Sequence, residues 1–283
     1  MPGIAIITDT DSSIPFEIAA RFNIYQVPMT IHFGEESFEA VYALSDIDTF
    51  RRIDLEDRLP TTAAPSPGKF IAAYKNAFAA GAEKIICLCV SSEVSATYNA
   101  AVSAVESFPD REIKVIDSRT LSMGLGYMVL AAAEVASQGA SIDEILWVAN
   151  ETRQRTHLFA ALSTLKYLAM GGRVSNLAAS FATMLNVKPI LTIRDGKLDL
   201  LERVRSQKKA WERVIELSAR QVGDQQIEKM CILHVNAPKM ASEFKHEIQS
   251  RMHCPQDIAL VEVTPGLSVH SGSGMVGTVF VVK

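Results

Sequence analysis

Two aspartates, Asp9 and Asp11, follow closely on the apolar run IAII at residues 4–7. A strand that ends in Asp-x-Asp can present the first carboxylate as a nucleophile toward phosphorus, while the second transfers a proton. Such phosphatases hold Mg²⁺ with a further acidic pair, but this chain has no Asp-Asp dipeptide and Asp117 stands alone after KVI. Asp and Ser also commonly accept hydrogen bonds from backbone N–H groups where a strand turns into a helix. We favour this structural interpretation, with a Mg-dependent phosphate hydrolase that uses Asp9 as the alternative.

Hydroxyl side chains gather before two of the expected helices. Thr61 and Thr62 lie in LPTTAAPSPGKF, and Ser92 and Ser95 follow the apolar run 84–90. Each could be an ordinary turn or cap residue. At the carboxyl ends of neighbouring parallel strands, beside helix N-termini, they would also form an anion site that needs no phosphate-loop glycines.

Two further polar residues lie near glycines. Arg173 follows two glycines that end a predicted helix, and His270 lies in a glycine- and serine-rich segment, expected to be a loop, before the last strand. A surface arginine and a structural histidine are the ordinary interpretations. A guanidinium held close to the backbone can instead clamp a carboxylate, and a permissive loop leaves room for a ligand beside the histidine.

The first half of the chain alternates strand-like and helical patterns, which predicts a parallel sheet with crossover helices. The segment GKFIAAYKNAFAAG repeats apolar residues at helical spacing, and Ser141 with Glu144 three residues later predicts a capping box. The strand-like runs are residues 4–8, 24–31, 84–90 and 112–117.

After about residue 155 the pattern changes. Asp195-Gly196 between two strand-like runs in KPILTIRDGKLDLLERV predicts an antiparallel hairpin. We expect two domains, residues 1–155 and 156–283, with the cleft between them as the default ligand site. The second domain is expected to have an α+β fold, in which helices cover a sheet. Its strands are expected near 157–163, 230–235, 258–263 and 275–282, and its helices at 206–221 and 238–252.

Composition narrows the class of protein. The 283 residues carry a net charge of −4 with a pI near 5.9, which argues against a nucleic-acid partner. Hydrophobic residues make up 48% of the chain, yet no uncharged run approaches the ~18 residues of a membrane-spanning helix. A strand pattern begins almost at Met1, and we expect a cytoplasmic location. The four cysteines lack metal-site spacing, so buried, reduced thiols are expected.

Eight segments in order make the chain resemble the DegV family of bacterial proteins that bind long-chain fatty acids. The resemblance implies a Rossmann-like α/β N-terminal domain with a parallel sheet, of the type shared with dihydroxyacetone kinase. It also implies a C-terminal α+β domain with a mainly antiparallel sheet, and a buried tunnel that holds the fatty-acid carboxylate at the domain interface. The segments are ITDTDSSIP, PTTAAPSPGKF, SSEVSATYNAA, VIDSRTLSMGLG, YLAMGGRVSN, NVKPILTIRDGKL, ERVRSQKKA and VHSGSGMVG.

The resemblance also implies site residues and a partner. The protein would be a non-enzymatic lipid-binding subunit that presents the carboxylate to the catalytic subunit of an ATP-dependent fatty acid kinase, and the acyl phosphate would serve phospholipid synthesis. It implies no metal and no cofactor besides the bound fatty acid. The carboxylate-binding positions match Thr62, Ser95, Arg173 and His270, with Thr61, Asp9 and Ser92 in support.

The chain departs from the family pattern beside these positions. Ala63 and Ala64 replace the serine and glutamine of T-S-Q-P, and Ala96 replaces the glycine of S-G-T. Asp11 adds an acidic residue to the common T-D-S start, which would raise the cost of holding a second negative charge nearby. A carrier of another apolar acid or of an isoprenoid therefore stays open as a further alternative.

Arg173→Ala is predicted to weaken acyl phosphorylation more than fatty-acid binding, because the guanidinium would fix the head group while the acyl chain supplies most of the affinity. The measurement compares kinase turnover, with the partner enzyme present, against the dissociation constant of the variant alone. Turnover equal to that of the wild type would remove Arg173 from the site.

Overall fold

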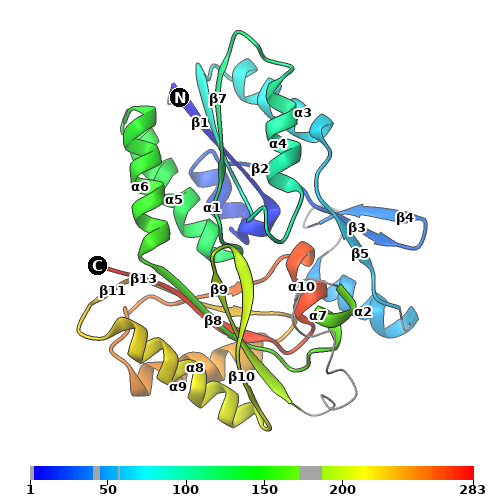
Figure 1. Cartoon of the computed structure of the whole chain (residues 1–283), viewed down its shortest axis with the longest axis vertical. Helices are drawn as coiled ribbons and strands as arrows, with labels where there is room; N and C mark the ends of the chain where they lie inside the picture. The colour runs from blue at the N-terminus through cyan, green and yellow to red at the C-terminus, as the bar shows by residue number, and fades with distance from the viewer. Residues whose placement is uncertain (1–2, 41–44, 57, 172–186) are drawn as a thin grey trace.

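The computed structural model describes residues 3–40, 45–56, 58–171 and 187–283. Within them, a four-stranded parallel sheet and a six-stranded, mainly antiparallel sheet form the two halves of the molecule, upper and lower in Figure 1. A three-stranded antiparallel sheet lies at one side of both. The predicted α/β class is confirmed, with a Rossmann-like parallel sheet followed by an α+β sheet.

The parallel sheet has the strand order β2-β1-β6-β7. Successive side chains of a strand point to opposite faces, so Ile7 and Ile85 pack with α3 and α4, whereas Ile6 and Ile86 pack with α1, α5 and α6. The predicted capping box opens α6. The elements are β1 (Ile4–Asp9), α1 (Phe16–Arg21), β2 (Tyr25–Val27), α3 (Pro67–Ala79), β6 (Lys84–Cys89), α4 (Thr97–Val105), β7 (Glu112–Asp117), α5 (Met123–Ser137) and α6 (Ile142–Gln154).

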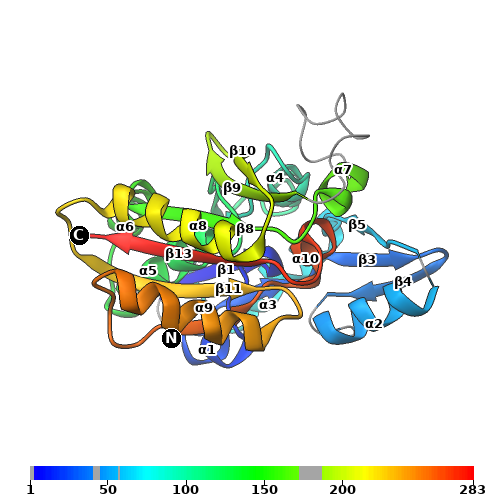
Figure 2. The ribbon, with the colours of Figure 1, turned by 90° about the horizontal axis from the view of Figure 1, so that it is seen from below.

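The second sheet has the order β10-β9-β8-β13-β11-β12 and is antiparallel except for the pair β11–β12. Helices α8 and α9 cover one of its faces (Figure 2). The predicted hairpin is confirmed, with Asp195 and Gly196 both at positive φ in its turn. The domain division at residue 155 stays a prediction. The elements are β8 (Thr156–Ala161), β9 (Lys188–Arg194), β10 (Lys197–Val204), α8 (Gln207–Val222), β11 (Ile227–His234), α9 (Pro238–Arg251), β12 (Ala259–Glu262) and β13 (Val276–Val282).

The three-stranded sheet corrects two expectations. The single strand expected over 24–31 is wrong, because the chain leaves the parallel sheet at Pro28, which has no N–H to continue the ladder. Thr61 and Thr62 lie in a strand of this antiparallel sheet and do not follow a parallel strand. Its elements are β3 (Thr30–Phe33), β4 (Glu36–Glu39) and β5 (Thr61–Ala63), with α2 (Asp46–Glu56) beside them.

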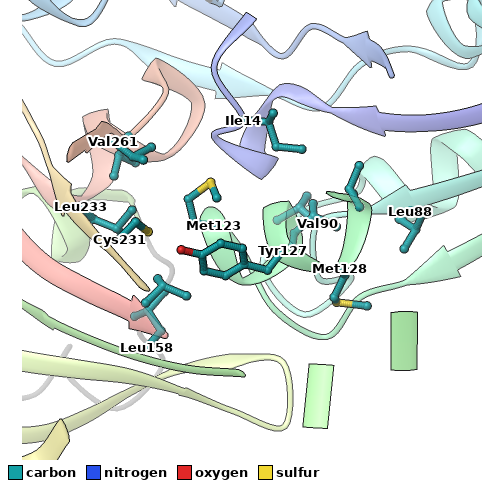
Figure 3. Packing of buried hydrophobic residues seen from close by; sticks show 14 of the residues in the cluster. Ile14, Leu88, Val90, Met123, Tyr127, Met128, Leu158, Cys231, Leu233 and Val261 are labelled. Atoms are coloured by element: carbon teal, nitrogen blue, oxygen red, sulfur yellow. The ribbon is translucent and has the colours of Figure 1, made fainter. Parts of the chain in front are cut away.

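Helix α5 joins the two large sheets through a shared apolar core. Eleven of its fifteen residues are buried. In Figure 3, Met128 lies toward Leu88 of the parallel sheet, while Tyr127 points toward Leu158 and Cys231 of the six-stranded sheet. The two halves are therefore held together by apolar packing and not only by the connecting chain.

Other expectations concern thiols and membranes. All four cysteines are free, and Cys87, Cys89 and Cys231 are buried as expected. None of the helices in the described ranges combines the length and apolar composition needed to cross a membrane. Nor do the described side chains bring three or more His, Cys, Asp or Glu residues together in a group that could hold a metal ion.

The tip of the β9–β10 hairpin contacts the loops that follow β6 and β7. Arg119 Nη2 donates a hydrogen bond to the carbonyl oxygen of Asp195 at 2.5 Å. Glu93 pairs with Arg119 at 3.1 Å and with Lys197 at 3.3 Å. Gly196 has a φ of +82°, and a Cβ there would lie 2.6 Å from Ser91 Oγ. The hairpin is thus seated on the parallel-sheet half by close contact at a glycine.

Gly196→Ala is expected to destabilise the protein by more than the roughly 1–2 kcal/mol that an L-residue costs in the left-handed region, because its methyl group would also collide with Ser91. Gly139→Ala is the matched control, since Gly139 has a φ of +86° with no atom within 4 Å of an added Cβ. Thermal unfolding of both variants measures the difference. Equal losses would show that the close approach of Ser91 to Gly196 adds no cost beyond the backbone strain.

Candidate functional site

A cavity of about 380 Å³ lies between the six-stranded sheet and the carboxyl ends of β1 and β6. Its volume is within the range usual for small-molecule sites, about 300–1,000 Å³. The sheet face opposite α8 and α9 supplies much of its apolar wall. The leucine and alanine residues of this wall are Leu158, Ala160, Leu162, Leu191, Leu198 and Leu233.

Thr62 and His270 form a polar contact at the cavity wall. Thr62 Oγ1 and His270 Nε2 are 2.9 Å apart and form a hydrogen bond, although 208 positions separate the two residues. His270 lies in the helix α10 (Pro265–Ser271), so the expectation of a loop is wrong. Pro265 favours this start of the helix, and Gly272 ends it at a positive φ of +82°.

Ser95 lines the same cavity, just before α4. Its hydroxyl lies 2.8 Å from Thr97 Oγ1, and Thr97 Oγ1 in turn donates to Met29 Sδ at 3.6 Å. Met29 is an ordinary core residue by type and carries no signal in the sequence. It lies in the break between β2 and β3.

Ser92 also lines the cavity and is held by Asp117 at the end of β7. Ser92 Oγ donates to Asp117 Oδ2 at 2.5 Å, and Ser92 N donates to Asp117 Oδ1 at 3.1 Å. In the sequence Asp117 stands out only as a lone carboxylate without the second acid of a metal pair, although its place at the end of a strand is a signal for this role. Its carboxylate orients a hydroxyl of the cavity wall.

Asp9 and Thr61 do not reach the cavity. Asp9 is fully buried behind the wall, where its Oδ1 accepts from Asp11 N at 2.9 Å and its Oδ2 from Val90 N at 2.8 Å. Thr61 is exposed on β5, next to Thr62. Because both Asp9 oxygens accept backbone hydrogen bonds, the geometry favours the structural interpretation of this residue over a nucleophile.

Asp11, unlike Asp9, lies in the wall of the cavity. It lies in the short 3₁₀ helix η1 (Thr10–Ser12), lines the cavity, is 2% exposed, and its Oδ1 has no hydrogen-bond partner. Burial raises the pKa of both Asp9 and Asp11, and the negative charge of Asp9 raises the pKa of Asp11 further. Backbone N–H groups that donate to Asp9 lower its pKa, whereas Asp11 Oδ1 has no hydrogen-bond partner, so of the two Asp11 has the greater tendency to hold a proton.

The structure thus brings Thr62, Ser92, Ser95 and His270 to one cavity. Arg173 lies outside the described residues. The apolar wall carries no chemical signal in the sequence, because its leucines and alanines look like ordinary core residues. An apolar chain with a polar head group is the kind of molecule that such a lining can hold.

Comparison with known proteins gives the family. The model of the family described as "Uncharacterised protein, DegV family" matches residues 3–283. The chain belongs to the DegV family. The DegV domain-containing protein SCO2569 of Streptomyces coelicolor is 32% identical over 277 residues, which cover 98% of this chain and 97% of that protein. The DegV domain-containing protein BH3627 of Halalkalibacterium halodurans is 30% identical over 277 residues, 98% of each chain.

Solved DegV structures share this fold over almost the whole chain. A DegV family protein from Thermus thermophilus, described as binding fatty acid, superimposes with a TM-score of 0.91 at 25% identity over 99% of both chains. DegV of Bacillus subtilis, described as a fatty acid binding protein, gives a TM-score of 0.87 at 25% identity over 99% of both chains. The order of sheets and helices around the cavity is therefore a family property.

The raised pKa values of Asp9 and Asp11 predict that the ligand-free protein loses stability as pH rises from about 5 to 8. The folded protein keeps protons that the unfolded chain releases above about pH 4, so the stabilisation is complete below that pH and is lost through the folded-state pKa values. Asp11→Asn removes one of these protons and should make the decline shallower, by at most about 1.4 kcal/mol per pH unit.

Chemical denaturation at several pH values measures this decline. Glu106→Gln, a change at an exposed carboxylate, is the control and should keep the wild-type slope. A wild-type slope in Asp11→Asn as well would mean that Asp11 is ionised throughout the range.

Proposed function

We propose that this protein binds a long-chain fatty acid in the cavity, with the carboxylate at Thr62, Ser95 and His270 and the acyl chain along the leucines of the six-stranded sheet. The observation that carries the proposal is the Thr62–His270 hydrogen bond at the wall of a cavity otherwise lined largely by apolar side chains. Arg173 is proposed to join these three residues.

Burial of the acyl chain is the source of affinity in this proposal. Each buried methylene contributes about 0.8 kcal/mol, so a chain of ~15 methylenes contributes on the order of 12 kcal/mol before the costs of association are subtracted. The carboxylate must give up its water, and an unpaired buried anion is strongly unfavourable. Hydroxyl and imidazole donors at one place on the wall would offset that cost.

The further part of the proposal is a role as the substrate-presenting subunit of an ATP-dependent fatty acid kinase in the bacterial cytoplasm. It rests on the sequence motifs that this chain shares with such subunits. In this role the protein does no chemistry itself; it holds the carboxylate for the partner enzyme, and the acyl phosphate goes on to phospholipid synthesis.

A different apolar acid is the second candidate ligand. Ala64 and Ala96, two of the positions where the chain departs from the family pattern, both line the cavity. Ala64 is smaller and less polar than the usual glutamine, and Ala96 has less backbone freedom than the usual glycine. The polar wall of this cavity therefore differs from the family pattern. The hydrolase alternative has no comparable support, because Asp9 does not face the cavity.

Mass spectrometry of an organic extract of the purified protein tests the proposal. We expect a stoichiometric long-chain fatty acid that is absent from a mock purification. Thr62→Val should lower the amount retained, and its affinity by about tenfold, because it removes a hydroxyl that contacts the carboxylate. Thr61→Val, a change at the neighbouring exposed residue, should retain the wild-type amount.

Three outcomes contradict parts of this proposal. An empty extract, with no fatty acid taken up on incubation, would overturn fatty-acid binding. Recovery of another apolar acid would select the second candidate. Equal retention by Thr62→Val and Thr61→Val would keep the ligand and remove Thr62 from its head-group site.

A further inference from the structure

Asp11 is a buried carboxyl group of the cavity that the head-group residues leave unexplained. It is 2% exposed and lines the cavity, and its Oδ1 has no hydrogen-bond partner. A buried oxygen without a partner is unfavourable and uncommon. Its neighbour Asp9 differs, because both Asp9 oxygens accept backbone N–H groups.

Asp11 lies against the same helix as His270. A Cβ built on Gly266 would be 2.1 Å from Asp11 Oδ1, so this oxygen touches the backbone of α10 at Gly266. Gly266 and His270 are four residues apart and therefore share a helix face, about 6 Å apart along the axis. A ligand carboxylate between the Thr62–His270 pair and Gly266 would lie about half a helical turn, roughly 3 Å, from each group, within hydrogen-bond reach of both.

Met29 connects Asp11 with Ser95 on the other side. The Cβ position on Gly266 is also 3.0 Å from Met29 Cγ. Met29 Sδ accepts from Thr97, whose hydroxyl contacts Ser95. Asp11, Ser95 and His270 all line the cavity and are linked through Gly266 and Met29.

We propose that Asp11 is an additional ligand-binding residue, a neutral carboxylic acid that donates a hydrogen bond to the carboxylate of the bound fatty acid. This inference rests on the proposed function. The ligand brings a negative charge, and Asp9, which accepts a hydrogen bond from Asp11 N, brings a second one when it is ionised. An ionised Asp11 would repel the ligand carboxylate and an ionised Asp9. A protonated Asp11 can instead donate a hydrogen bond to the ligand carboxylate, and this bond gives its buried carboxyl group a partner.

Binding of palmitate to three variants at pH 7 tests the role of Asp11. Asp11→Asn keeps the shape and a donor, so its dissociation constant should stay within about threefold of the wild type. Asp11→Ala removes the donor and should raise the dissociation constant about tenfold or more. Ser12→Ala is the matched control, since Ser12 is buried beside Asp11 with an unpartnered hydroxyl but does not line the cavity.

The opposite result has a clear meaning. If Asp11 were an anion, both Asn and Ala at this position would bind palmitate more tightly than the wild type, and the proposal would be wrong. Unchanged binding by Asp11→Ala would overturn it equally, while the proposed function stood. No palmitate binding by the wild type would overturn the proposed function and this inference with it.

Infrared difference spectra give a second readout that does not depend on affinity. The wild type minus Asp11→Asn spectrum at pH 7 should show the C=O stretch of a protonated carboxyl group, and palmitate should shift it. A spectrum with carboxylate bands alone would show that Asp11 is ionised and would reject the proposal even if the Ala variant bound poorly.

Discussion

The architecture depends on the burial of α5 between two sheets. A helix with eleven of fifteen residues buried has almost no polar face to show to solvent, so it needs apolar partners on both sides. The parallel sheet supplies one and the six-stranded sheet the other (Figure 3). This packing places one face of the six-stranded sheet opposite the carboxyl ends of β1 and β6, and the space left there is the cavity.

Pairing of buried polar groups organises the rim of that space. Ser92 is fixed by Asp117, Thr62 by His270, and Asp9 by two backbone N–H groups. The Asp9 and Ser92 bonds lie within the parallel-sheet half. The Thr62–His270 bond joins residues 208 positions apart, so that part of the polar wall exists only when the C-terminal segment is in place. Asp11 is the exception, and its raised pKa follows from the same burial that orders its neighbours.

Sequence patterns predicted the regular elements because apolar periodicity reports which face of a strand or helix is buried. They failed where local chemistry and tertiary context compete. Pro28 interrupts what reads as one strand over 24–31, and the two pieces join different sheets. The segment around His270 reads as a glycine-rich loop, but a proline start and packing against α7 (Lys166–Gly171) and β5 make it a short helix.

The sequence by itself determined the family, the two kinds of sheet and most of the polar residues of the candidate site, because motif order and periodicity are properties of the chain alone. Only the tertiary structure decided which of these residues meet. It placed Thr62 and His270 in contact and gathered leucines from separate strands into one wall. It also directed the Asp9 side chain toward backbone N–H groups and the Asp11 side chain toward the cavity. Such contacts depend on strand order and helix packing, which sequence spacing does not specify.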